Sequence, residues 1–202
     1  MERKHIKGGK LRRELLSKIR DRINNGEERQ SIFEDLCSKF IEQDYIAGFI
    51  ARVPSPEDGH EIKKMNSFLI IIIYTWAGLT FLANLTIFIP IILKDNRFLI
   101  AFPIVFLWPI VAFWMALQIK KYDGLFYRFI GLLSIVGICK ELQGLIDVQP
   151  GNIILYIYYL IIISLLIIAS VISFKIKKRF FSHLTFFGVK KEGRNFILGR
   201  EE

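Results

Sequence analysis

The chain has 202 residues, of which 52% are hydrophobic, and it carries a formal net charge of +9 at pH 7. The long apolar runs lie between about residues 65 and 174, whereas most charged residues lie outside them. This segregation argues against a single soluble core and is typical of membrane-spanning helices. The basic first 22 residues contain no apolar segment, so we expect no secretory signal peptide.

Residues 1–64 are predicted to form a cytosolic helical module. Apolar residues recur at helical spacing in three short segments, and Asn24-Asn25-Gly26 separates the first segment from the second. The apolar positions are Leu11, Leu15, Ile19 and Ile23 in the first segment, Ile32, Phe33, Leu36, Cys37, Phe40 and Ile41 in the second, and Ile46, Phe49 and Ile50 in the third, between Asp44 and Arg52.

This module has three interpretations. Its apolar stripes can pack on one another or on a cytosolic protein partner, which we favour. Its basic first helix can instead lie on anionic lipid through residues such as Arg12 and Arg13, because each basic residue contributes about 1 kcal/mol near such a surface. The third interpretation is a membrane-tethered helix-turn-helix. Its recognition helix should be basic, whereas the second and third segments are nearly uncharged or acidic, so we do not expect nucleic acid as a partner.

Four apolar runs are predicted to cross the bilayer, over residues 67–93, 98–119, 125–146 and 153–174. The first exceeds the about 20 residues that a crossing needs, so its helix is expected to tilt or to extend beyond the bilayer. The second contains Pro103 and Pro109, which membrane helices tolerate as kinks. The third is marginal, because it contains Lys140 and Glu141. At the centre of the bilayer these charges would cost about as much as its apolar residues gain, but they lie off-centre and cost less. The predicted fold class is therefore all-α, a polytopic membrane protein with four transmembrane helices.

Basic residues give the orientation. They gather before the first run, between the second and third runs, and after the fourth, at Lys63, Lys64, Lys120, Lys121, Lys177, Lys178 and Arg179. The positive-inside rule then places both termini in the cytoplasm of a multi-pass cell-membrane protein. Residues 175–202 form a basic cytosolic tail, whose first basic residues are expected to contact lipid headgroups. The rest of this tail has two alternative structures. One is a small hairpin around residues 192–194, and the other is a segment along the membrane surface.

The third run carries the candidate site. Small residues and one carboxylate fall at spacings of three and four and form one stripe, Gly131, Ser134, Gly137, Glu141 and Gly144. Small residues let helices approach closely in a bilayer, so the stripe predicts helix packing and self-association.

Ionisable groups within spans suggest function. Glu141, with Lys140 about 100° around the helix and Asn84 in the first run, is therefore a candidate intramembrane polar site. Self-association would allow Lys140 of a second copy to pair with Glu141. In the alternative interpretation, Lys140 and Glu141 lie at the outer end of the helix and Asn84 only joins helices.

Common catalytic and cofactor motifs are missing, including phosphate-binding loops and metal-ligand spacings. His5, His60 and His183 are scattered and are expected to be ordinary surface histidines, and Cys37 and Cys139 are expected at different depths. We therefore expect no catalytic residue, no metal and no cofactor. The sequence favours a non-enzymatic assembly, sensing or regulatory component that forms a homo-oligomer in the lipid bilayer. The alternative is a channel or transporter subunit that conducts through an oligomer, and an intramembrane enzyme is the least favoured.

Residues 26–40, the segment Ile50-Ala51-Arg52-Val53-Pro54 and the first apolar run together resemble a group of proteins. These are small uncharacterised prokaryotic multi-span membrane proteins with an N-terminal cytosolic helical segment. The resemblance covers about the first third of the chain. It implies that arrangement of segments and no activity.

Overall fold

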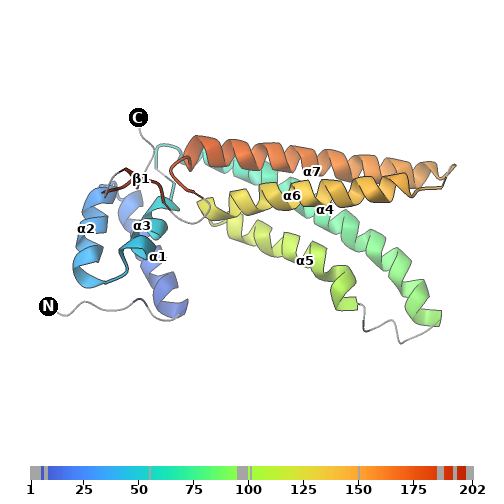
Figure 1. Cartoon of the computed structure of the whole chain (residues 1–202), viewed down its shortest axis with the longest axis horizontal. Helices are drawn as coiled ribbons and strands as arrows, with labels where there is room; N and C mark the ends of the chain where they lie inside the picture. The colour runs from blue at the N-terminus through green and yellow to red at the C-terminus, as the bar shows by residue number, and fades with distance from the viewer. Residues whose placement is uncertain are drawn as a thin grey trace. The chain divides into compact units, whose positions relative to one another are not determined.

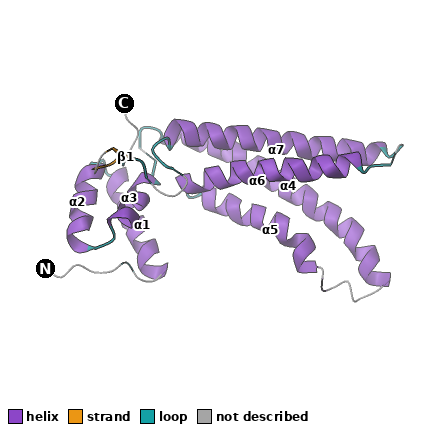
Figure 2. Ribbon diagram, in the orientation of Figure 1, coloured by secondary structure: helices purple, strands orange, loops and turns teal. Residues whose placement is uncertain are grey.

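The computed structural model describes residues 6, 9–54, 56–94, 100, 102–149, 151–185, 189–192 and 195–198. These residues form seven α-helices and one pair of short strands (Figures 1 and 2), which confirms the all-α fold class for the described part of the chain. In chain order the elements are α1 (Gly9–Asn24), α2 (Arg29–Lys39), α3 (Gln43–Ala51), α4 (Gly59–Lys94), α5 (Phe102–Ile119), α6 (Gly124–Ile146), α7 (Ile153–Phe180), β1 (Lys191–Glu192) and β2 (Asn195–Phe196).

The chain divides into two compact units. Unit 1 contains residues 1–64, 122–125 and 175–202, and unit 2 contains residues 65–121 and 126–174. Unit 1 therefore combines the two ends of the chain with the short connection between α5 and α6. Helices α4, α6 and α7 each contribute residues to both units.

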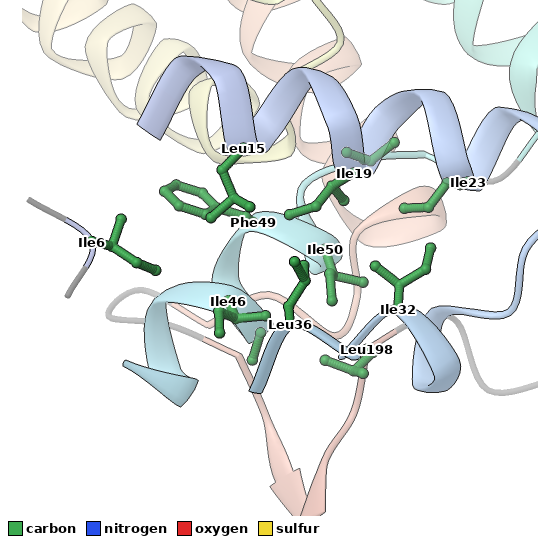
Figure 3. Packing of buried hydrophobic residues seen from close by; sticks show 12 residues of the cluster. Ile6, Leu15, Ile19, Ile23, Ile32, Leu36, Ile46, Phe49, Ile50 and Leu198 are labelled. Carbon is green, nitrogen blue, oxygen red and sulfur yellow. The ribbon is translucent and has the colours of Figure 1, made fainter. Parts of the chain in front are cut away.

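The core of unit 1 is built from α1, α2 and α3. Their buried apolar side chains point toward one another, as Figure 3 shows for Leu15, Ile19, Leu36 and Ile50. Most residues of the stripes predicted from helical spacing form this core or pack against it, and Leu11 is a half-buried exception. Ile41 differs, because α2 ends at Lys39 and the next residue is extended, which leaves Ile41 45% exposed.

Helix α1 ends where the sequence predicts. Gly26 has a φ of +82°, a conformation that glycine adopts without a steric penalty. The amide of Glu27 donates to Arg22 O at 3.1 Å and that of Gly26 to Ile23 O at 3.0 Å. This pair of bonds is a Schellman motif, which satisfies the last carbonyls of the helix.

Three helices, α4, α6 and α7, are long and apolar enough to cross a membrane. Helix α4 has 36 residues and is longer than a crossing needs, as its apolar run predicts. Helix α6, the run predicted to be marginal, belongs to this set. The second predicted run is the shorter helix α5, whose apolar stretch covers Val105–Ile119. Residues 98, 99 and 101 of that run lie outside the described residues, so the described residues contain three candidate spans where the sequence predicts four.

Aromatic rings pack α4 against α5 within unit 2. The ring centroid of Phe106 lies 4.9 Å from that of Phe81 and 6.1 Å from that of Phe88. Trp76 and Trp108 meet edge to face at 6.4 Å. Such pairs hold two helices together by shape as well as by apolar area.

The tail after α7 forms a short antiparallel pairing, as in the hairpin alternative. Lys191 pairs with Phe196 and Glu192 with Asn195, so the ladder contains only two residue pairs. Residues 193 and 194, where the turn is predicted, lie outside the described residues. An isolated bridge between Leu184 and Val189 precedes the ladder. A ladder this short is not stable alone in water, so its position depends on packing within unit 1.

Candidate functional site

The small-residue stripe of α6 faces α7 of the same chain. A Cβ atom built on Gly131 would lie 2.9 Å from the ring of Phe174, and one on Gly144 would lie 2.7 Å from the hydroxyl of Tyr159. At Gly137 the nearest atom, Cδ1 of Leu166, would be 3.1 Å away. The glycines therefore let α6 approach α7 closely, and the two helices run side by side in Figure 1.

Two buried serines, Ser134 and Ser170, lie on these two helices. Ser134 is 2% exposed, and the hydroxyl of Ser170 donates to Gly131 O at 3.4 Å. The residues predicted for helix packing thus pack within one chain. This stripe is covered before any second copy approaches.

Glu141 is buried, with 5% of its surface exposed. Its Oε1 lies 3.8 Å from Nζ of Lys140 in the same chain, and the Lys140 side chain is 61% exposed. Adjacent side chains diverge by about 100° around a helix, but the long lysine stem bends back toward the carboxylate. The separation exceeds that of a charge-assisted hydrogen bond, so the two groups form a loose ion pair. Glu141 therefore has a cation nearby without one from a second copy.

Two tyrosines of α7 complete the surroundings of this carboxylate. Glu141 interacts electrostatically with Tyr158 and Tyr159. Because α6 and α7 pack through Gly144 and Tyr159, the end of α6 lies beside the start of α7. The sequence identifies these tyrosines only as interfacial residues. The sequence feature that predicts their position near Glu141 is the short turn between α6 and α7, because a short turn makes two helices antiparallel neighbours.

Asn84 does not take part in this cluster. Its Nδ2 donates to Val105 O at 3.0 Å, which joins α4 to α5. No described interaction connects Asn84 to Glu141. Its geometry matches the alternative interpretation, a polar side chain that joins two helices.

Asn66 is a polar residue that the sequence analysis missed. It is 2% exposed, donates from Nδ2 to Ile119 O at 2.9 Å, and accepts from the hydroxyl of Tyr127 at 2.9 Å. One side chain thereby connects α4, α5 and α6. It lies just before the first predicted run, so the apolar pattern of that run does not include it.

Four of the five residues predicted to contact lipid headgroups are exposed, Arg12, Arg13, Lys178 and Arg179, and Lys177 is half-buried. The Arg12 guanidinium lies 5.0 Å from the ring centroid of Tyr45, and Arg179 Nη1 lies 2.6 Å from Glu61 Oε1. These contacts leave room for headgroups, since exposed ion pairs are weak and exchange readily.

The half-buried Arg29 and the buried His183 connect separate stretches of unit 1. Arg29 donates to Ile50 O at 2.8 Å, to Val53 O at 2.7 Å and to Leu198 O at 3.0 Å. Burial lowers the pKa of Arg29 from its ordinary value.

The prediction of three surface histidines is wrong for His183, which is 4% exposed. Packing of the tail against α3, which local periodicity does not reveal, buries it. His60 is exposed as predicted, and His5 lies outside the described residues. Cys37 is half-buried and Cys139 is exposed. Among the described residues, no group of three or more histidine, cysteine, aspartate or glutamate side chains could hold a metal ion.

Comparison with known proteins gives no relative. No protein-family model matches the chain, and neither a curated protein nor a solved structure matches it significantly. The contacts of its own residues therefore carry the functional argument.

Proposed function

We propose that this chain is a non-enzymatic integral membrane protein that acts as an assembly, sensing or regulatory component. Its three long apolar helices are compatible with membrane insertion. Unit 1 adds a helical module with a core of its own. A folded module carried by membrane helices suits a protein that works through contacts at the membrane surface.

We further propose four crossings, with α5 as the fourth, and the composition of unit 1 carries this proposal. Helices α4 and α6 both begin in unit 1, and α7 ends there. The amide of Gly124 donates to Arg52 O at 3.3 Å, which attaches the connection before α6 to the module. A chain that leaves this side of the membrane through α4 must return before Gly124, and α5 is the described helix between them. Its 18 residues span about 27 Å, close to the ~30 Å of a hydrocarbon core.

Charge favours the cytosol as the side that holds unit 1. The basic residues that flank the membrane helices lie at the start of α4, around the α5–α6 connection and at the end of α7. These are the ends that unit 1 brings together. By the positive-inside rule both termini are then cytoplasmic.

Reporter fusions test this topology. Fusions at Lys64, Asn96, Asp123, Gln149 and Glu202 are expected to report the cytosol, the outside, the cytosol, the outside and the cytosol. If α5 does not cross, the fusion at Asp123 would report the same side as that at Asn96, and Glu202 would lie outside. That pattern would refute the four-crossing topology.

We also propose that copies of the chain associate in the membrane. The exposed side chain of Lys140 on a membrane-capable helix supports this proposal, because a cationic side chain on a lipid-facing surface is costly unless protein or headgroups surround it. The mass of the detergent-solubilised protein tests it. An oligomer is expected, and a monomer at all protein concentrations would contradict it.

A channel subunit is the second candidate function, favoured by the buried Glu141 beside Lys140. Glu141→Ala and Glu141→Gln, with the exposed Gln143→Ala as a matched control, separate the candidates. Altered ion flux in liposomes at unchanged oligomer mass would support conduction. A smaller oligomer mass, more so for alanine than for glutamine, would support assembly. If neither variant changes flux or mass, Glu141 serves only the packing of α6 on α7.

A further inference from the structure

The end of the C-terminal tail packs onto the N-terminal helices within unit 1. We call residues 181–185, 189–192 and 195–198 the tail segment. Leu198 is 6% exposed and belongs to the core formed by α1, α2 and α3 (Figure 3). The ring of Phe196 lies 5.5 Å from that of Phe33, and Lys191 Nζ lies 2.9 Å from Asp44 Oδ1. The tail segment therefore covers apolar side chains that would otherwise face water.

His183 lies where the tail segment meets the end of α3. Its Nε2 is 2.8 Å from Ala51 O. A carbonyl only accepts, so Nε2 carries the proton and Nδ1 of the neutral ring does not. Nδ1 is buried and has no hydrogen-bond partner among the residues that the structure describes. The carbonyl of His183 accepts from the amide of Lys190 at 2.9 Å, which fixes the backbone of the tail segment at the same point.

Within the described part of the chain, the charged groups that act on His183 are cations. Arg29 contributes from α2, Lys177 from α7 and Lys190 from the tail segment itself, while α3 contributes only the Ala51 carbonyl. Asp58 acts on Arg29. Protonation of His183 would add a further positive charge to this group, together with a buried N–H that has no acceptor. Both changes disfavour the docked tail segment.

We propose that His183 is a proton-sensitive latch, which holds the tail segment on the helical module when neutral and releases it when protonated. Release uncovers the apolar side chains of the module that the tail segment covers. The proposal concerns unit 1 alone, so it does not depend on the number of membrane crossings.

The direction of the pH effect follows from the two states. Burial holds the pKa of His183 in the docked state below its ordinary value of 6.5. The released tail segment regains an ordinary pKa and binds the proton more readily. Docking is therefore complete above about pH 6.5 and weakens by up to about tenfold per pH unit below it, until the pH passes the lower pKa of the docked state.

Hydrogen exchange of the full chain in lipid nanodiscs tests the latch. The amides of Lys190 and Ile197 are hydrogen-bonded in the docked tail segment, to His183 O and Lys190 O. After correction for the intrinsic exchange rate, their protection is expected to fall by up to about tenfold per pH unit from about pH 6.5 downward. The amides in the middle of α7, which belong to unit 2, should stay protected over the same range. Tail protection that is constant down to pH 5 would overturn the proposal.

Two variants make the test specific. His183→Gln keeps an N–H donor for Ala51 O and cannot titrate, so its tail segment should stay protected at every pH. His60→Gln removes an exposed histidine and should keep the pH response of the unaltered protein. An unchanged response in His183→Gln would overturn the latch. If the tail segment of that variant is unprotected even at pH 8, the pH dependence of protection in the unaltered protein separates the two outcomes. Protection that begins to fall near pH 6.5 supports the latch. Protection that begins to fall only near pH 4, where carboxylates titrate, overturns it.

Discussion

Arg29 shows how one side chain joins distant parts of a chain. Its guanidinium donates to two carbonyls near the end of α3, those of Ile50 and Val53, and to that of Leu198 in the tail segment. A planar group with five N–H donors suits three acceptors in fixed positions, and lysine has no equivalent geometry. The sequence presents Arg29 only as the first residue of a short helix.

We expect Arg29→Met to destabilise unit 1 by about 2–4 kcal/mol, because three carbonyls lose a charged donor and part of the core becomes unsatisfied. Hydrogen exchange of the α2 and α3 amides in the full chain measures this change. Arg13→Met is the matched control, because Arg13 is exposed on α1. Equal effects of the two substitutions would mean that the three hydrogen bonds contribute no net stability.

Leu36→Asp tests the core of the module. Leu36 is 7% exposed and belongs to the apolar cluster of unit 1, so the substitution buries an unpaired carboxylate at a cost of several kcal/mol. Protease cleavage within residues 1–56 should accelerate strongly. Ser31→Asp, on the exposed surface of the same helix, should cleave like the unaltered protein. Unchanged cleavage of Leu36→Asp would indicate that this stripe faces lipid.

At the scale of helices, the glycines of α6 decide how closely α6 and α7 pack. Gly131→Leu places a branched side chain where even a Cβ atom would lie 2.9 Å from the ring of Phe174. Overpacking of this kind costs about 1–3 kcal/mol. The thermal unfolding midpoint in detergent should fall by several degrees, whereas Val136→Leu, at a position that is 58% exposed, should change it little. If Gly131→Leu lowers the oligomer mass at an unchanged midpoint, the stripe serves contacts between copies instead.

Local pattern predicts the helices well and their contacts poorly. Apolar spacing places α1, α2 and α3, and Gly26 marks the end of α1. The glycines of the stripe in α6 lie against α7, and spacing alone cannot say which helix covers them. Asn66 shows the same limit, because its two partners lie on other helices. The position of Lys140 beside Glu141 depends on side-chain flexibility, which helical geometry does not describe.

On the scale of the whole molecule, unit 1 is built from three stretches that are far apart in sequence. The burial of His183 and the contribution of Leu198 to the core both result from this assembly. Periodicity within a segment carries no information about partners more than a hundred residues away. The sequence therefore predicts separate N-terminal and C-terminal segments, and the structure places both in one unit.

A shortened chain tests this dependence. A chain that ends at Val189 lacks Lys191, Phe196 and Leu198, so the α1–α3 core loses part of its cover. Proteolysis within residues 1–56 is expected to be several-fold faster than in the complete chain, because local opening becomes easier. A chain that ends at Leu198 is the control and should resist like the complete chain. Equal resistance of both shortened chains would show that the three N-terminal helices fold without the tail.

The composition of unit 1 also sets an order of events during synthesis. Helices α1, α2 and α3 leave the ribosome first, whereas Leu198 and the last acceptor of Arg29 emerge only after α7 has been made. The core of the module therefore stays open on one side while the membrane helices are being inserted. A chain that stalls within unit 2 lacks Leu198 and leaves apolar side chains of this core uncovered, which makes it prone to aggregation and degradation.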